Sequence, residues 1–366
     1  MMRKLRVAVS GVGWCGCEHI KAFQSHPACE VVLLHGRDEA RIRQNLERYG
    51  VQRCEARIST RAEDIFEDGS IDIVSLAGIH STHMPLALEA ARAGKHVMIE
   101  KPVARNEADL NRLLEAVEKS AVKTVVSFEL YWNPLFKVAR WLIDSGQLGQ
   151  VMFVRSNYHS RMGSWYSGWD WCRSQAEGWG LLLNAGCHSI DAVRNFLGDD
   201  PVSVSAFSST GLEQGYQYPT TLHANIRFAG GGLGQISASA DVATPYHFGL
   251  EIFGTKLSLV NQHLRWPSGA EVDVHQLQRE CPVPGVRFFL EPYSETHSQI
   301  RIDCVLPNSV NVEHHPFRDE VSALVEAIQK DGQAPVSLRK AAVTHRICFA
   351  ADRSAASGGQ PVTLVS

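Results

Sequence analysis

The first 128 residues alternate between short apolar stretches and longer stretches with helical periodicity. Aliphatic and β-branched side chains dominate residues 5–10, 31–34, 71–76, 96–99 and 124–128, which is typical of buried strands. Between these stretches apolar residues recur three or four positions apart, as at Ile42, Leu46 and Tyr49. Strands that alternate with amphipathic helices form βαβ units around a parallel sheet. We therefore expect an α/β domain over residues 1–128.

A glycine motif follows the first predicted strand, at the place where such sheets bind dinucleotides. It reads Gly11-Val12-Gly13-Trp14-Cys15-Gly16, in the order Gly-x-Gly-x-x-Gly. Gly11 permits a tight turn, Gly13 lets the backbone approach a pyrophosphate, and Gly16 lets the helix pack closely on the strand. A glycine-rich turn without a ligand is the alternative, but a strand before the motif and a helix after it favour a nucleotide. The motif therefore predicts a dinucleotide-binding Rossmann-type domain, with Val12 and Trp14 as further cofactor contacts.

The end of the second predicted strand bears on the choice between NAD and NADP. An acidic residue there would bind the ribose 2′-hydroxyl of NAD, but this chain has Gly36 followed by Arg37. Arg37 can pair with a 2′-phosphate or stack on adenine, so Gly36 and Arg37 favour NADP over NAD. The alternative is that Arg37 is a solvated turn residue and Asp38 only caps the next helix.

Two later predicted strands also end in candidate cofactor contacts. Ligands bind at the carboxyl ends of parallel strands, where this chain has His80, His83, Glu100 and Lys101. Lys101 comes just after a predicted strand and is followed by the rigid Pro102, so its ammonium group can lie beside nicotinamide and a substrate oxygen. The alternative is that Lys101 is an ordinary surface lysine. We interpret the two histidines as loop and helix-start residues, because no third or fourth metal ligand lies at a suitable spacing; a metal site is the alternative.

After Phe128 the alternation stops and strand-like stretches dominate. A predicted helix over residues 134–144 is followed by predicted strands at 151–158, 202–208, 220–228, 233–240, 248–253 and 257–260. Residues 220–228 alternate apolar and polar side chains, so one face of their sheet is buried and the other meets water or a partner. We expect residues 129–366 to form an α+β domain with a large, mostly antiparallel open sheet.

A largely apolar predicted helix over residues 181–193 carries three polar side chains. Asn184, His188 and Asp191 stand at i, i+4 and i+7, so they share one face. A polar stripe on a buried helix faces partners, buried water or a ligand cavity. The alternative is that His188 is a satisfied structural histidine.

Just before this helix lies a cluster of tryptophans. Four of the eight tryptophans fall between residues 165 and 179. Tryptophan faces pack on sugar C–H surfaces and polar side chains bind hydroxyls, so this region is the predicted substrate wall. Its candidate contacts, with the weaker candidate Tyr246, are Tyr158, Arg161, Trp165, Trp169 and Asp170. A hydrophobic plug or a subunit contact is the alternative for each tryptophan.

Charge, hydropathy and cysteine spacing exclude several kinds of binding partner and location. A formal net charge of −3 argues against nucleic acid and polybasic membrane binding. The chain has no run of ~18 apolar residues, the length of a membrane helix. Its nine cysteines have no framework spacing, which indicates reduced thiols and a cytoplasmic protein.

Several of these stretches resemble one known family. The glycine motif with His19, and the stretch 93–102 that reads AGKHVMIEKP, are similar to the glucose-fructose oxidoreductase / inositol 2-dehydrogenase / MocA family. The resemblance continues through residues 180–191 and the C-terminal stretch 335–359. The resemblance implies that Lys101 and His188 are catalytic. It also implies that residues 129–366 bind substrate and use their open sheet in oligomer contacts, so that the chain is a homo-oligomer, a dimer or tetramer. It also marks a departure, because the family usually has aspartate where this chain has Asn184, and an amide cannot ionise.

Together these features predict an NAD(P)-dependent oxidoreductase that transfers a hydride between nicotinamide and a hydroxyl or keto carbon of a sugar, cyclitol or derivative. In oxidation, neutral His188 takes the hydroxyl proton, Lys101 stabilises negative charge on that oxygen, and Asn184 orients His188 or a substrate hydroxyl. Two alternatives stay open. One is a glycoside hydrolase or lyase that uses bound NAD(H) transiently, and the other is a catalytically inactive cofactor-binding sensor.

Overall fold

The structure, a computed structural model, describes residues 3–164, 166, 168–198, 200–211, 215–304 and 316–364. The chain packs into two compact units, each of which draws on separate stretches of sequence. The first unit consists of Met1–Glu129, Ser164–Trp179 and Pro316–His345, and the second of Leu130–Gly163, Gly180–His315 and Arg346–Ser366. Division into domains 1–128 and 129–366 stays a prediction, since two later stretches pack with the first unit.

The first unit is built on a parallel sheet. Within the described residues its six strands run in the order β3-β2-β1-β4-β5-β6. Their bounds are β1 Leu5–Ser10, β2 Cys29–His35, β3 Arg57–Ser59, β4 Ile73–Leu76, β5 His96–Ile99 and β6 Thr124–Val126. This order confirms the Rossmann-type fold, and it reverses direction between β1 and β4, where such sheets bind ligands. The short edge strand β3 was not predicted, because three residues carry too little pattern.

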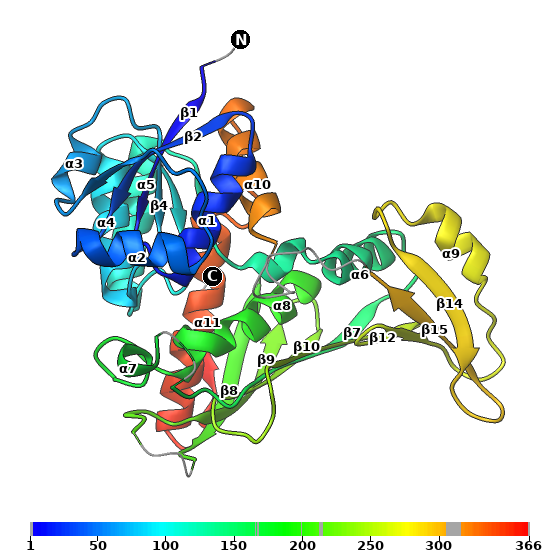
Figure 1. The fold of residues 1–366 in the computed structure, drawn as a ribbon. Coiled ribbons are helices and arrows are strands. Elements are labelled where there is room, and N and C mark those ends of the chain that lie inside the picture. The colour runs from blue at the N-terminus through cyan, green and yellow to red at the C-terminus, as the bar shows by residue number, and fades with distance from the viewer. Residues whose placement is uncertain are drawn as a thin grey trace. The chain divides into compact units, whose positions relative to one another are not determined.

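Helices cover both faces of this sheet (Figure 1). Right-handed crossovers put helices on opposite faces when the strand order reverses. Accordingly α1 packs beside α10, and α4 packs beside α5. The helices of this unit are α1 Trp14–Ser25, α2 Glu39–Arg48, α3 Glu63–Phe66, α4 His80–Arg92, α5 Glu107–Ser120, α7 Trp169–Cys172 and α10 Phe317–Gln329.

The stretch 316–345 is joined to β6 and to the loop after β5 by hydrogen bonds. The Val126 N–H donates to the Val336 carbonyl at 2.9 Å, and the Leu338 N–H donates to Thr124 Oγ1 at 3.0 Å. The His345 ring accepts from the Val103 N–H at 2.9 Å. His345 lies in α11 (Leu338–Ala356), whose later residues belong to the second unit.

The second unit contains the predicted open sheet. Within the described residues ten strands run in the order β14-β15-β13-β12-β11-β7-β10-β9-β8-β16, and only the pair β7–β10 is parallel. Their bounds are β7 Val151–His159, β8 Pro201–Ser209, β9 Thr221–Phe228, β10 Leu233–Ser239, β11 His247–Gly254, β12 Ser258–Val260, β13 His263–Arg265, β14 Arg287–Pro292, β15 Ser298–Asp303 and β16 Val362–Thr363. The mostly antiparallel sheet is confirmed, but β13 to β16 were not predicted. The other helices are η1 Glu129–Trp132, α6 Pro134–Asp144, α8 Cys187–Leu197 and α9 Val274–Glu280.

The helix expected over residues 181–193 is not a uniform α-helix, and that expectation is wrong in part. Leu182–Gly186 form a π-helical turn (η2), in which the Cys187 N–H donates to the Leu182 carbonyl five residues earlier. α8 follows and packs on β7 and β10. A Cβ on Gly186 would lie 2.9 Å from that of Ala238, so this turn approaches β10 more closely than a side chain allows. The change from α- to π-helix could not be predicted from the sequence, because the residues of this turn are as buried as those of α8 and show no separate pattern.

Candidate functional site

The glycine loop lies where the strand order reverses. Gly11 has φ +89°, and a Cβ on it would lie 2.2 Å from the Gly78 nitrogen, so the loops after β1 and β4 touch. A Cβ on Gly16 would lie 2.0 Å from the Gly11 carbonyl oxygen. A Cβ on Gly13 would instead meet nothing within 4 Å, and no side chain caps the helix that begins after it. This open cradle of N–H groups fits the pyrophosphate of a dinucleotide.

The two other predicted contacts in the motif face inward. Val12 is buried in the core. The Trp14 ring meets the edge of Phe317 in α10, with centroids 6.2 Å apart. Their roles as cofactor contacts stay predictions.

A chain of buried hydrogen bonds connects α1, β4 and the loop after β5. His19 Nδ1 lies 2.8 Å from Ser75 Oγ, and His19 Nε2 lies 3.2 Å from Glu100 Oε1. Burial would raise the pKa of Glu100, but the hydrogen bond from His19 and nearby positive charge, including Lys101, hold it below its ordinary value. Glu100 is therefore an ionised, fixed neighbour of Lys101.

His83 joins the loops after β4 and β5. Its Nδ1 lies 2.8 Å from the Pro102 carbonyl oxygen and its Nε2 lies 3.0 Å from that of Gly78. Burial lowers the pKa of His83, so the ring is neutral and donates to one carbonyl at a time. Lys101, half-buried, sits in the loop that this histidine holds.

His80 begins α4 and packs against the tryptophan-rich stretch. Its ring centroid lies 4.7 Å from that of Trp171 and 5.5 Å from that of Trp179. Burial, with the nearby charges of His83 and Lys101, holds the pKa of His80 well below its ordinary value. These two tryptophans therefore pack inside the first unit, which favours the plug alternative for them over the predicted substrate wall.

The predicted substrate contacts in this stretch have varied surroundings. Trp165 lies outside the described residues. The Trp169 ring lies 5.4 Å from the Arg173 guanidinium. The Asp170 side chain is 96% exposed and 3.7 Å from the same guanidinium. Their binding of substrate stays a prediction.

The second unit brings three other predicted residues together and gives a fourth, Asn184, a separate partner. The His188 ring stacks on that of Tyr158 with centroids 5.7 Å apart and planes 14° apart, and Tyr158 meets Tyr246 edge-on at 5.2 Å. Asn184 Nδ2 donates to the Tyr218 hydroxyl at 3.2 Å. The His188 imidazole thus lies against aromatic rings.

Two further polar residues of this unit have structural contacts. Asp191, on the polar stripe, forms a buried ion pair with Arg194 at 2.9 Å. Arg161 is exposed, and its backbone pairs with that of Asp241. A role of Arg161 toward substrate stays a prediction.

At the end of β2 the structure shows what surrounds Gly36. A Cβ there would lie 3.1 Å from Ile42 Cδ1. The Arg37 side chain is exposed and makes no ion pair or hydrogen bond within the described part of the chain. Asp38 caps α2 by accepting from the Ala40 N–H at 2.9 Å, as the alternative interpretation holds.

Two buried polar residues could not be predicted from the sequence around them: Tyr218, the partner of Asn184, and Glu320. Glu320 lies in α10, which packs on α1, β5 and β6, and neither of its oxygens has a hydrogen-bond partner of normal geometry in the described chain. Burial, with Glu129 and Glu100 nearby, raises the pKa of Glu320 well above its ordinary value. Burial and Glu100 likewise raise the pKa of the Cys15 thiol, so Cys15 is not a reactive thiolate.

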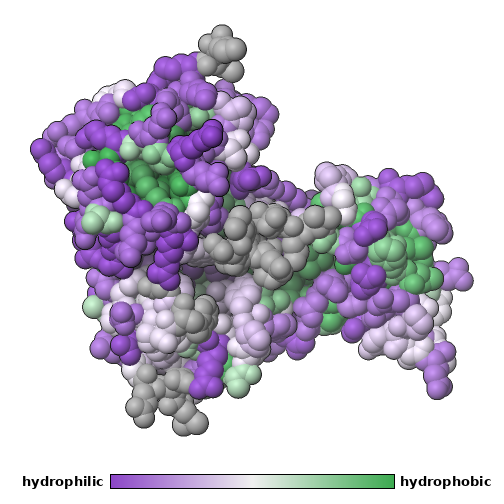
Figure 2. Space-filling view, viewed as in Figure 1, coloured by the Kyte–Doolittle hydropathy of each residue, from purple (hydrophilic) through white to green (hydrophobic). Residues whose placement is uncertain are grey.

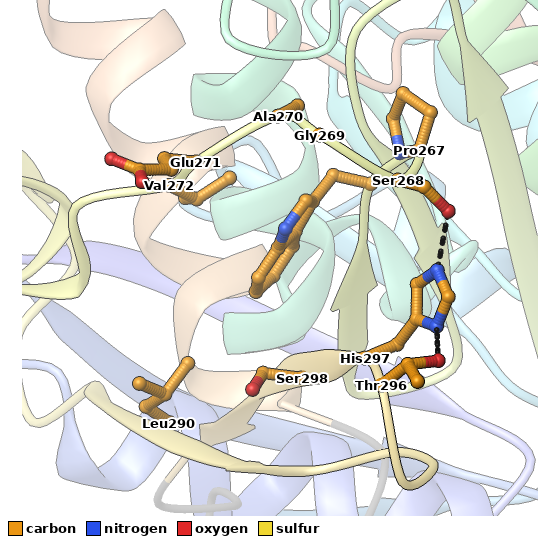
Figure 3. A pocket seen from close by; sticks show the side chains of 11 residues that line it. Pro267, Ser268, Gly269, Ala270, Glu271, Val272, Leu290, Thr296, His297 and Ser298 are labelled. Atoms are coloured by element: carbon orange, nitrogen blue, oxygen red, sulfur yellow. Dashed lines mark hydrogen bonds between the residues drawn. The ribbon is translucent and has the colours of Figure 1, made fainter.

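A separate pocket of about 590 Å³ lies beside the β14–β15 hairpin (Figure 3). His297 is 2.5 Å from Ser268 Oγ through Nε2 and 2.8 Å from Thr296 Oγ1 through Nδ1. The group beside His297 Nδ1 is thus the Thr296 hydroxyl, whereas a hydrolytic Ser-His-Asp triad has a carboxylate there. The pocket holds none of the predicted site residues.

Over the described ranges, no cluster of three or more His, Cys, Asp or Glu side chains has the arrangement of a metal site. No helix in those ranges is both long and apolar enough to cross a membrane. All nine cysteines lie in those ranges as free thiols.

The raised pKa of Glu320 predicts a pH-dependent stability. Because its pKa is higher folded than unfolded, the stability it contributes is present at low pH and is lost as pH rises. We expect the melting temperature of the native chain to fall more than that of Glu320→Gln between about pH 5 and about pH 9. Glu326→Gln, on the exposed side of the same helix, should follow the native chain. Parallel curves for the native chain and Glu320→Gln would contradict a buried neutral acid.

Comparison with known proteins bears on both units. The model of an oxidoreductase family with an NAD-binding Rossmann fold matches residues 5–128, and a GFO/IDH/MocA C-terminal domain matches residues 136–260. Myo-inositol 2-dehydrogenase of Thermotoga maritima is 24% identical over 80% of this chain and 85% of that protein. Levoglucosan dehydrogenase of Pseudarthrobacter phenanthrenivorans is 25% identical over 72% of this chain and 75% of that protein.

Solved structures agree on the fold. Levoglucosan dehydrogenase in complex with NADH and levoglucosan has a TM-score of 0.82 to this chain, covers 100% of both chains and is 19% identical. The two matched domains make the chain a member of the GFO/IDH/MocA family of NAD-binding oxidoreductases.

Proposed function

We propose that this chain transfers a hydride between a nicotinamide dinucleotide and a hydroxyl or keto carbon of a sugar, cyclitol or derivative. The observation that carries the proposal is the position of Lys101, in the loop after β5 that His83 ties to the loop after β4. That loop in turn touches the open glycine cradle. Relatives named as dehydrogenases of inositol and levoglucosan support the substrate class.

We assign the chemistry to three side chains. The bound nicotinamide ring supplies the hydride acceptor or donor. His188 takes the hydroxyl proton during oxidation, and Lys101 stabilises the negative charge that develops on the oxygen. Asn184 binds a substrate hydroxyl or orients His188. Substrate contacts are assigned to Tyr158, Arg161, Trp165, Trp169, Asp170 and Tyr246.

The test is a panel of myo-inositol, scyllo-inositol and levoglucosan, incubated with the purified chain and NAD or NADP. We expect reduced nicotinamide to form in proportion to oxidised product with at least one member. Lys101→Ala and His188→Ala should each lower that turnover by at least ~100-fold, the scale of acid–base and electrostatic groups.

Exposed residues supply the controls. Lys119→Ala and His275→Ala should leave turnover unchanged, since both side chains face solvent. Melting temperatures show whether each variant folds. Near-native turnover of either site variant would contradict its role. Release of an aglycone without net change in nicotinamide would indicate redox-assisted hydrolysis, and cofactor binding alone would indicate a sensor.

We propose further that the chain prefers NADP. The family model describes an NAD-binding Rossmann fold, and a solved neighbour holds NADH. The preference for NADP therefore concerns only the 2′-position of the adenosine ribose, where NADP carries a phosphate. The absence of a carboxylate at Gly36 supports it, as does Arg37, which is exposed and has no ion-pair partner among the described residues. The Asp38 carboxylate accepts hydrogen bonds from two backbone N–H groups of α2, so it caps that helix and does not replace the missing carboxylate at Gly36.

Gly36→Asp should shift the preference toward NAD, because a carboxylate there repels a 2′-phosphate and binds a 2′-hydroxyl. We expect the ratio of NADP to NAD dissociation constants to rise about tenfold, or ~1.4 kcal/mol. Gly36→Ala is the matched control, since it crowds Ile42 equally but adds no charge. Equal ratios for the two variants in equilibrium titrations would refute the assignment.

We also propose a cytoplasmic homo-oligomer, a dimer or tetramer that associates through the outward face of the open sheet. Phe207 of β8 and Leu233 of β10 are 64% and 51% exposed on that sheet. Further hydrophobic surface lies over α9, β14 and β15, where Leu290 and Tyr293 are exposed (Figure 2). Such exposed apolar area is typical of protein interfaces.

Light scattering of the purified chain should give two or four times 40.5 kDa. Leu233→Asp should lower that mass, because it puts a charge at the centre of the contact. A monomeric native chain would contradict the proposal, as would an unchanged mass for the variant.

A further inference from the structure

Residues 168–179, which we call the tryptophan segment, pack with the first unit although the chain on either side of Ser164–Trp179 belongs to the second. Short-range hydrogen bonds hold the segment together, such as that from the Cys172 N–H to the Gly168 carbonyl at 2.9 Å. Its helix α7 carries two proposed substrate contacts, Trp169 and Asp170. Bonds inside the segment fix its shape, so its place on the first unit depends on other contacts.

His80, the first residue of α4, makes those contacts. Its ring meets Trp171 edge-on, with centroids 4.7 Å apart and planes 76° apart, and it lies 5.5 Å from the Trp179 ring at 56°. The backbone of Glu177 and Gly178 also lies beside the ring, which is 4% exposed. Edge-to-face aromatic pairs add attraction beyond the area that they bury. His80 therefore contacts the segment from Trp171 to its end.

The Trp171 ring is also confined by its own segment. A Cβ on Gly168 would lie 2.8 Å from Trp171 Cζ2, so the indole rests directly on the backbone there. Because Trp171 belongs to α7, holding its ring between this backbone and His80 sets where α7 lies relative to α4. The two neighbouring side chains of α7, Trp169 and Asp170, are placed with it.

We propose that His80 is a positioning residue that seats the tryptophan segment on the first unit and so places Trp169 and Asp170 for substrate binding. His80 stands two residues after Gly78, whose backbone touches the glycine turn, so the segment is anchored beside the cofactor cradle. The inference rests on the proposed function. It gives His80 a role through the substrate segment in place of the cofactor contact expected from the sequence.

The charge state of His80 fits this role. Burial, with the charges of His83 and Lys101 nearby, holds its pKa well below the ordinary value, so the ring is neutral at neutral pH. A neutral ring packs against indoles without the cost of burying a charge. No bond of His83 to the two carbonyls that it joins involves His80, so losing His80 leaves the loop of Lys101 in place.

A seated segment acts on binding more than on the chemical step. If only part of the molecules hold the segment in place, the apparent affinity for substrate falls in proportion to that part. With the best polyol of the panel, we expect His80→Ala to raise KM about 5- to 10-fold, the scale of two aromatic contacts. The kcat value and the dissociation constant of the dinucleotide should each change less than about twofold.

Two variants show that the ring acts through the segment. His80→Phe keeps an aromatic edge against both indoles, so its KM should stay within about threefold of the native value. In a Trp171→Ala background, His80→Ala should change KM less than about twofold, because the ring that His80 holds is gone. His275→Ala, at an exposed histidine, is the control, and melting temperatures show whether each variant folds.

Hydrogen exchange measures the seating without turnover. Amides of residues 168–179 should exchange at least about fivefold faster in His80→Ala than in the native chain, whereas those of α5 should not change. Unchanged exchange of the segment would overturn the inference, as would equal effects of His80→Ala on KM in the native and Trp171→Ala backgrounds. A weakened dinucleotide with an unchanged KM would make His80 a cofactor contact and overturn it too. Faster exchange in a chain that turns over no polyol would support the seating and contradict the proposed function alone.

Discussion

The site of the first unit depends on the close approach of Gly11 to Gly78. The loops after β1 and β4 meet where a Cβ on Gly11 would lie 2.2 Å from the Gly78 nitrogen, and Gly11 adopts a φ that favours glycine. This contact brings together the two strands between which the sheet order reverses. Two residues later, a Cβ on Gly13 would meet nothing within 4 Å. The same turn therefore contains both the close contact with Gly78 and the open cradle of N–H groups.

Polar groups buried around this turn fix the loop that carries Lys101. The His83 ring lies between carbonyl oxygens of both loops and donates to one of them at a time, and His19 joins Glu100 to Ser75. Both Glu100 and Glu320 are buried, but their pKa values shift in opposite directions from the ordinary value. Glu100 has a hydrogen-bond donor in His19, whereas burial and neighbouring carboxylates favour the neutral form of Glu320.

Much of the first unit could be predicted from sequence, because its strands and helices are periodic and its glycines have local steric causes. The open sheet was also predictable from the alternation in β9, whose inward residues are buried. Long-range packing was not: the tryptophans that suggested a sugar-facing wall include Trp171 and Trp179, which pack on His80, about 90 residues earlier in the chain. Tyr218 and Glu320 gave no signal, since a lone tyrosine or glutamate acquires meaning only from its distant neighbours.

The most direct test of this account is a crystal structure of the chain with a bound nicotinamide dinucleotide. It should show the pyrophosphate at the backbone of Gly13 and the first turn of α1, with the nicotinamide ring directed toward the loop that contains Lys101. A dinucleotide bound away from the glycine turn, or a nicotinamide ring directed away from Lys101, would contradict the proposed reaction.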